Sequence, residues 1–185
     1  MTLVEQILEL HLHLDAAELP HAFGGALALA YCTLEPRGTR DIDVNVFVGI
    51  EQLSELVAAL PSGVEVTDVN RTELERDGQS RLWWADTPVD VFLSNHSFHD
   101  HAAANRRYVP LAGVDDLPVL ACADLAVFKA FFARPKDTVD VATMAVAGAI
   151  DVDNVEAQVV MLLGDESTRA DFFARVRDDV ERMSG

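Results

Sequence analysis

Three aspartates in the first half of the chain have the type and spacing of a metal site. Asp41 and Asp43 are two residues apart in segment 41–48, where aliphatic side chains occupy every second position. Residues two apart on a β-strand share a face, so the Cα atoms of the two aspartates are expected roughly 6 to 7 Å apart. Asp90 lies in a second segment of the same kind, 88–94, and is expected to face the same way.

Three carboxylates on one face need a counter-charge. Two like charges about 4 Å apart repel by about 4 kcal/mol at an effective dielectric of 20, unless solvent, hydrogen bonds or a cation offset the repulsion. Hard divalent cations such as Mg²⁺ take carboxylate oxygens, and two-metal sites hold ions roughly 3.5 to 4 Å apart. Asp41, Asp43 and Asp90 are therefore candidate magnesium ligands and catalytic residues. The alternative is that they are solvated acids on exposed sheet faces.

A pair of glycines, Gly24 and Gly25, precedes an alanine-rich run that has the character of a helix, 26–34. Glycines at the start of a helix let an anion approach backbone N–H groups where the helix dipole is positive. We expect this pair to hold the phosphates of a nucleotide, the alternative being an ordinary turn. His21, just before the glycines, is expected to border the nucleotide.

The periodicity of apolar residues places these side chains on an α/β framework. In the first half we expect helices over 2–14, 26–34 and 50–60, and strands over 41–48, 64–69, 81–86 and 88–94. After residue 97 the pattern becomes mainly helical, over 97–107, 123–133, 135–147, 154–163 and 167–183. We therefore predict an α/β core over residues 1–110 and a mainly helical C-terminal portion, packed on that core, over 111–185.

Two runs around the glycines and aspartates resemble a known signature. The sequence HAFGGALALAY from His21, followed by PRGTRDIDV from Pro36, resembles the signature of the DNA polymerase β nucleotidyltransferase superfamily. The later runs ADLAVFK from Ala123 and RPKDTVD from Arg134 are similar to the helical Lys and Lys-Asp-x-x-Asp motifs of its AbiEii-like, abortive-infection branch. The resemblance covers about residues 20–145. It departs from the usual pattern in two respects, a Gly-Gly pair in place of Gly-Ser and a longer stretch before Asp41.

The resemblance implies a nucleotidyltransferase-like mixed β-sheet flanked by helices, and it assigns roles to individual residues. The glycines would hold a triphosphate, the first two aspartates would bind the metals, and Asp90 would complete the site and favour deprotonation of an acceptor hydroxyl. Later basic residues would face the phosphates, and later acids would hold that region in place. The nucleotide-binding set is Gly24, Gly25, Arg40, Lys129 and Arg134, and the supporting set is Arg37, Asp137 and Asp140.

The function implied is magnesium-dependent transfer of a nucleoside monophosphate from a nucleoside triphosphate, such as ATP, to an acceptor hydroxyl. Resemblance to the AbiEii-like branch implies a toxin with a cognate antitoxin, acting on RNA ends or on protein. A second interpretation is transfer to a small cationic acceptor, as aminoglycoside nucleotidyltransferases do. A third is a nucleotide-binding or regulatory protein that keeps the fold without turnover.

The charge of the chain limits the nature of the acceptor. The net charge of −17 arises from 31 acidic and 14 basic residues, which argues against a general nucleic-acid-binding surface. RNA binding is expected only at a local basic rim, for which the candidates are Arg37, Arg40, Arg106, Arg107 and Lys136. A cationic small molecule would instead be attracted by the acidic field.

Two further features of the sequence concern its surroundings. No uncharged apolar run is long enough to cross a membrane, and no secretory leader is visible, so we expect a cytoplasmic protein without a membrane partner. Cys32 and Cys122 lie in apolar surroundings without CxxC spacing. We expect them to be buried free thiols.

Overall fold

The computed structural model describes residues 1–164 and 169–185, and the chain divides into two compact units. Unit 1 comprises residues 1–27 and 38–120, and unit 2 comprises residues 28–37 and 121–185. In the described parts of the chain, no helix is both long enough and apolar enough to cross a bilayer.

Unit 1 is built on a mixed β-sheet. Among the described residues, seven strands pair in the order β3-β4-β5-β2-β1-β7-β6. The pairs β2–β5 and β1–β7 are parallel, and the other neighbours are antiparallel. The strands are β1 (His21–Phe23), β2 (Ile42–Val46), β3 (Val64–Glu65), β4 (Gln79–Trp84), β5 (Thr87–Leu93), β6 (Arg107–Leu111) and β7 (Val114–Val119).

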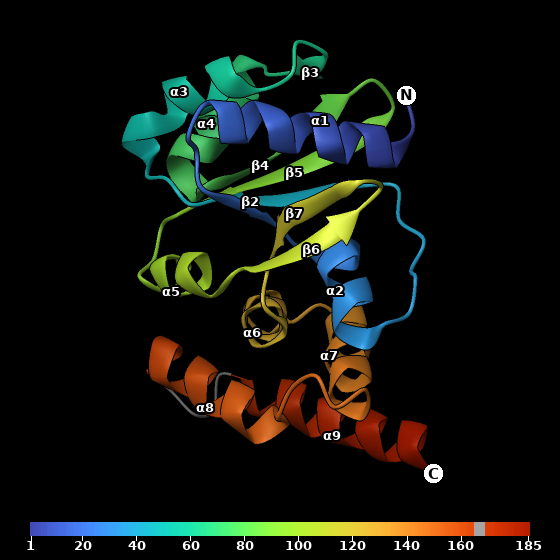
Figure 1. Ribbon diagram of the computed structural model, residues 1–185. Helices are drawn as coiled ribbons and strands as arrows, with labels where there is room; N and C mark the ends of the chain where they lie inside the picture. The colour runs from blue at the N-terminus through green and yellow to red at the C-terminus, as the bar shows by residue number, and fades with distance from the viewer. Residues whose placement is uncertain (165–168) are drawn as a thin grey trace. The chain divides into compact units, whose positions relative to one another are not determined.

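Two helices of unit 1, α1 (Leu3–Ala16) and α3 (Leu53–Ala59), lie on one face of this sheet (Figure 1). Thr2 caps α1 with a capping box to Glu5, and Leu10 and Leu14 are fully buried, which confirms the predicted first helix. The unit also contains the first residues of α2 (Gly25–Thr33). The remaining helical segments of unit 1 are η1 (Ile50–Gln52), α4 (Asp68–Asp77) and α5 (Phe98–Asn105).

The two faces of the central strands have different chemistry. On β2, Ile42 and Val44 are buried, and their register partners on β5, Val89 and Val91, are buried too. These residues form the apolar face of the sheet, as the alternation predicted. The residues between them point to the opposite face, where the polar side chains of β2 and β5 gather.

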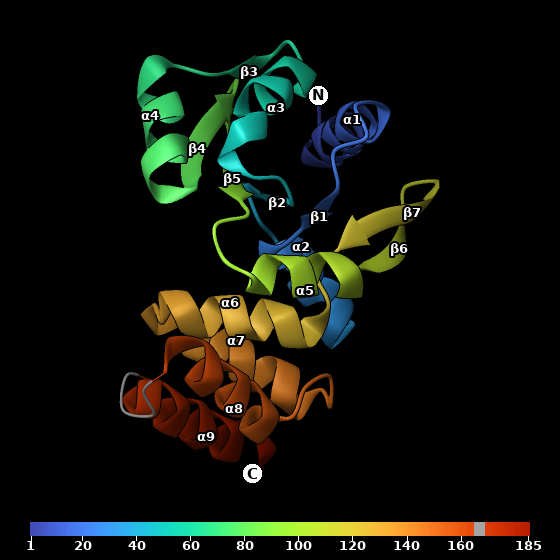
Figure 2. The same ribbon diagram turned by 90° about the vertical axis from the view of Figure 1, so that its left-hand side faces the viewer.

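Unit 2 is helical. It contains residues 28–33 of α2 together with α6 (Cys122–Phe132), α7 (Pro135–Val146), α8 (Val152–Leu163) and α9 (Ala170–Ser184). Helix α7 packs against α6 and α9, and α8 packs against the same two helices (Figure 2). Their common core includes Val141, Met144 and Phe173, which have no exposed surface. The predicted helix over 167–183 corresponds to α9, and positions 167 and 168 lie outside the described residues.

The cysteines differ from the expectation of free thiols. Cys32 in α2 and Cys122 at the start of α6 form a disulfide, with 5.6 Å between their Cα atoms. Free thiols were expected because the two cysteines lie in apolar runs without CxxC spacing. Their sequence separation is 90, and the folding of segment 28–37 with unit 2 brings them together.

The boundary between the units also differs from the predicted one. The helical portion begins at Cys122 and not at residue 111, because β6 and β7 form a hairpin that joins the sheet of unit 1. The strand expected over 64–69 is reduced to β3, and α4 follows it directly. The three-residue strand β1 was not expected either. The mixed α/β fold class itself is confirmed.

Candidate functional site

Asp43 and Asp90 are neighbours on the polar face of the sheet. They are register partners on the parallel strands β2 and β5, and both are half-buried. Adjacent strands lie about 4.8 Å apart, so the two side chains emerge side by side. Asp41 lies one residue before β2, where the Thr39 hydroxyl donates a hydrogen bond to its carboxylate. The predicted proximity of Asp43 and Asp90 thus agrees with the register of the two strands.

The glycines lie against Asp43. The Gly24 N–H donates to the Asp43 carbonyl at 2.9 Å, which ties the end of β1 to β2. Gly25 begins α2 with a φ of +51°, and a Cβ at this position would lie only 1.8 Å from Asp43 Oδ2. Glycine is therefore required at position 25 by the Asp43 side chain and by the backbone conformation together.

Arg81 is a member of this cluster that the sequence interpretation missed. It lies directly opposite Asp90 on the antiparallel neighbour β4, and it donates from Nε and Nη2 to the two carboxylate oxygens of Asp90, both at 2.7 Å. The signal for it was present in the sequence: a two-residue turn at 85–86 between alternating segments places residue 81 opposite residue 90.

The chemistry of this cluster suits a hard divalent cation. The three carboxylates supply the oxygen donors that Mg²⁺ takes, and two of them sit on adjacent strands beside the N-terminus of a helix. Within the described residues, no three His, Cys, Asp or Glu side chains are arranged to hold a metal ion, and both oxygens of Asp90 are engaged by Arg81. The type of the donors, three carboxylates, fits Mg²⁺, but their arrangement in this structure does not form a metal cluster, and Asp90 is paired with Arg81.

His21 does not border this cluster. Its register partner on β2 is Val46, so its side chain points to the apolar face, and it is only 4% exposed. His21 Nδ1 donates to the Leu19 carbonyl at 2.8 Å, and its Nε2 lies 2.9 Å from His11 Nδ1. Burial lowers the pKa of His21 to about 4, although the bond to Leu19 opposes this shift. His21, which was expected to border the nucleotide, thus lies on the face of the sheet opposite to Asp43 and Asp90.

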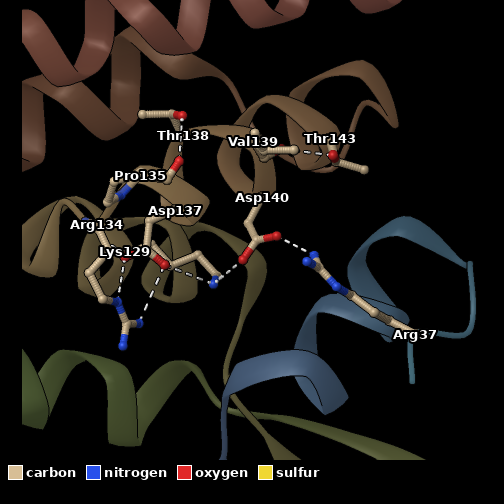
Figure 3. A network of polar contacts seen from close by, with 9 residues as sticks. All are labelled: Arg37, Lys129, Arg134, Pro135, Asp137, Thr138, Val139, Asp140 and Thr143. Carbon is tan, nitrogen blue, oxygen red and sulfur yellow. Dashed lines mark hydrogen bonds and ion pairs between the residues drawn. The ribbon is translucent and has the colours of Figure 1, made fainter. Parts of the chain in front are cut away.

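The basic and acidic residues of the later motifs form a separate network within unit 2 (Figure 3). Lys129 is buried in α6, and its Nζ donates to Asp140 at 2.6 Å and to Asp137 at 3.3 Å. Arg37 also donates to Asp140, from the segment that follows α2. The charges alternate along this chain of contacts, which is how buried ions are kept paired.

Arg134 completes the network at the start of α7. Its Nε donates to Asp137 Oδ2 at 2.8 Å, and its backbone N–H donates to the same oxygen at 3.1 Å. Burial acts to raise the pKa of Asp137, but the hydrogen bonds from Arg134 and the charge of Lys129 outweigh it, so that this pKa is lowered. The Arg134 side chain is 52% exposed, in contrast to Lys129. Arg40, in unit 1, is exposed.

Comparisons with known proteins bear on the fold. No family model and no curated protein matches the sequence. The structure is similar to that of the antibiotic-resistance factor ANT(2'')-Ia in solution, with a TM-score of 0.63 at 17% identity over 87% of this chain and 91% of that one. It is also similar to ANT(2'')-Ia in complex with adenylyl-2''-tobramycin, with a TM-score of 0.64 at 18% identity over 89% and 98% of the two chains.

A third similar structure is that of another nucleotidyltransferase-like protein. The antigenic nucleotidyltransferase-like protein from Paracoccidioides brasiliensis matches with a TM-score of 0.53 at 16% identity, over 94% of this chain and 92% of that one. At these identities the likeness concerns the fold. The chain therefore has a nucleotidyltransferase-like fold, as the signature around the glycines and aspartates predicted.

Proposed function

We propose that this protein transfers a nucleoside monophosphate from a nucleoside triphosphate to an acceptor hydroxyl. The observation that supports it best is the register pairing of Asp43 with Asp90 beside the start of α2, within a fold of the nucleotidyltransferase type. Asp41, one residue before β2, is the third carboxylate of the proposed site.

The triphosphate is assigned to the N-terminus of α2. The first turn of this helix contains no acidic residue, so an anion there meets the positive end of the dipole without repulsion from the helix itself. Because the Gly24 N–H is bonded to Asp43, the backbone donors proposed for the phosphates are those from Gly25 onward. Exposed Arg40 is proposed as a further phosphate contact.

The carboxylates are assigned to the metal and to the proton. Asp41, Asp43 and Asp90 would hold Mg²⁺, which when bound neutralises phosphate charge and acidifies the attacking hydroxyl. Asp90, which lies next to Asp43 on the neighbouring strand, would accept the proton of that hydroxyl.

The network in unit 2 has a supporting role in this proposal. Arg134 is the residue of this network that we propose as a phosphate contact, since more than half of its side chain is exposed. Buried Lys129 would hold Asp137 and Asp140, and through them Arg134 and Arg37, in fixed positions.

The acceptor favoured by the charge of the molecule is a small cation. A net charge of −17 attracts cationic molecules and repels polyanions, and a structure with the same fold holds adenylyl-2''-tobramycin. The second candidate follows from the AbiEii-like motifs: a cytoplasmic toxin that modifies RNA ends or protein and is neutralised by an antitoxin.

The proposal can be tested by incubating the pure protein with each α-labelled triphosphate, Mg²⁺ and one of three acceptor preparations: tobramycin, extracted RNA or extracted protein. Label is expected on one acceptor class with the wild type. Asp43→Asn should reduce the transfer at least about 100-fold, because the site needs the charge and not only the shape of this side chain.

Asp115→Asn provides the matched control, since it removes an equal charge from an exposed position on β7. Its transfer rate should equal that of the wild type. Nucleotide binding without label on any acceptor would contradict the proposal and support the non-catalytic interpretation. A large fall in the melting temperature of Asp43→Asn in EDTA would show that Asp43 is structural.

A further inference from the structure

Asp90, which is proposed as a metal ligand, is held in an ion pair by Arg81. Both oxygens of Asp90 accept a hydrogen bond from the one guanidinium, in the bidentate geometry that gives the strongest pairing of this kind. The Arg81 side chain is 53% exposed and that of Asp90 is 18% exposed, so the pair lies at the surface of the polar face and not in the core.

Arg81 interacts electrostatically with all three carboxylates, those of Asp41, Asp43 and Asp90. The hydrogen bonds to Asp90 and the charge of Asp90 raise the pKa of Arg81, and the charges of Asp41 and Asp43 contribute in the same direction. Its guanidinium is thus within electrostatic reach of all three. A positive charge at this place relieves the mutual repulsion that would otherwise oppose keeping three ionised acids together.

A guanidinium and a divalent ion would compete for Asp90. The two oxygens already accept N–H donors in the plane of the carboxylate, and a metal ion entering beside Arg81 would meet a like charge at short range. Binding of Mg²⁺ to Asp90 and pairing of Asp90 with Arg81 therefore oppose each other.

We infer that Arg81 is a resident counter-cation of the site and that it competes with the divalent ion for Asp90. Metal binding transfers Asp90 from Arg81 to the ion and releases the guanidinium, so Arg81 lowers the affinity of the site for metal and stabilises the metal-free protein. The inference rests on the proposed function only in taking the three aspartates as a metal site.

The test measures Mn²⁺ binding by the loss of the free-ion EPR signal, with no nucleotide and no acceptor present. Arg81→Gln should bind Mn²⁺ at least about tenfold more tightly than the wild type, a change of about 1.4 kcal/mol. The gain should disappear in Arg81→Gln combined with Asp43→Asn. In EDTA, Arg81→Gln should melt below the wild type, and Mn²⁺ should reverse this difference.

Arg76→Gln is the matched control. Arg76 forms a bidentate pair with Asp77 at the end of α4, in the same unit, and this pair is exposed as well. Its Mn²⁺ affinity should be that of the wild type. Arg81→Lys, which keeps the charge and loses the fork of donors, should fall between the wild type and Arg81→Gln, and it provides the test if the glutamine variant does not fold.

Unchanged or weaker Mn²⁺ binding by Arg81→Gln would overturn the inference, and so would the absence of Mn²⁺ binding by both the wild type and Arg81→Gln. The contact between Arg81 and Asp90 would then be only a cross-strand salt bridge. The outcome is separable from that of the proposed function. Tighter Mn²⁺ binding without nucleotide transfer would remove the proposed reaction alone, whereas normal transfer with unchanged Mn²⁺ binding would remove the role of Arg81 alone.

Discussion

At the scale of single residues, Gly25 is tied to Asp43 by contact as well as by conformation. Its φ of +51° is disfavoured for other residues, and the position of a Cβ is already taken by the Asp43 carboxylate. The sequence singled out this glycine because a helix N-terminus that binds phosphate favours glycine. The structure adds a second reason, the contact with Asp43.

Gly25→Ala should therefore damage the site more than the fold. The added Cβ displaces Asp43, and we expect transfer to fall at least about 100-fold while the free energy of unfolding falls by about 1 to 3 kcal/mol. Gly148→Ala separates the two effects, because Gly148 has a φ of +70° and no atom within 4 Å of its added Cβ. That control should lose stability and keep its transfer rate. Wild-type transfer by Gly25→Ala would contradict the role given to Asp43.

His21 predicts how stability depends on pH. The Leu19 carbonyl can only accept, so His21 Nδ1 carries the proton, and in the neutral ring Nε2 accepts from His11. Because the pKa of His21 falls from 6.5 to about 4 on folding, the unfolded chain binds the proton more readily. The contribution is complete above about pH 6.5, declines as the pH falls from 6.5 to 4, and does not decline further below 4.

Between pH 6.5 and pH 5 this loss should reach about 2 kcal/mol in the free energy of unfolding. Urea unfolding of the wild type and of His21→Gln at both pH values measures it, and the variant should lack this component. His13→Gln, on the exposed side of α1, should keep the wild-type dependence. Equal pH dependence in all three proteins would show that His21 is not the group responsible.

At the scale of elements, helices and strands were predicted most accurately where one face of the element is buried and the other is not. Strands β2 and β5 were found because one face of each is buried, and α1 was found from its apolar spacing and its cap. Helix α4 was missed because Leu74 is its only buried residue, so that its signals are the capping box at Thr67 and the left-handed Gly78 at its end.

The hairpin of β6 and β7 was missed for a different reason. Pro110 and Pro118 interrupt the two strands, and the turn at Ala112 and Gly113 was the remaining indication. For the site, residue types indicated the three aspartates, whereas the pairing of Asp43 with Asp90 depends on the register of strands distant in sequence. No local pattern specifies that register.

The disulfide between α2 and α6 gives a prediction at this scale. A crosslink that closes a loop of 90 residues restricts the unfolded chain, and such bonds typically contribute about 2 to 4 kcal/mol. Cys122→Ser should lower the free energy of unfolding by that amount under oxidising conditions and by much less with dithiothreitol present. In the cytoplasm both residues would be kept largely as thiols. Equal stability of wild type and variant without reductant would show that the bond contributes nothing.

At the scale of the whole molecule, the acidic charge extends to the surroundings of the basic residues. Arg106 donates to the Ala103 carbonyl and to the Tyr108 hydroxyl, and it lines a cavity of about 230 Å³ in unit 1. Three carboxylates line the same cavity, those of Asp15, Glu18 and Asp116. A phosphate approaching Arg106 would meet these acids as well.

RNA binding should accordingly be weak and depend little on salt. Each neutralised phosphate contributes about 0.7 to 0.9 to the log–log slope, and we expect a total slope of about two to four. Fluorescence anisotropy of a labelled single strand across a KCl series measures it. Charge reversal at Arg106 and Arg107 should weaken transfer to RNA and leave transfer to tobramycin intact. A slope well above four, or undiminished RNA labelling by the double variant, would contradict this prediction.

The path of the chain through the two units limits how the gene can recombine. The chain passes from one unit to the other after Leu27, after Arg37 and after Leu120, so segment 28–37 belongs to unit 2 although its neighbours in sequence belong to unit 1. A gene broken after Leu120 would leave this segment without Asp140 and Cys122, its ionic and covalent partners. A single recombination event therefore cannot exchange one unit intact, and the two units are expected to be passed on and altered together.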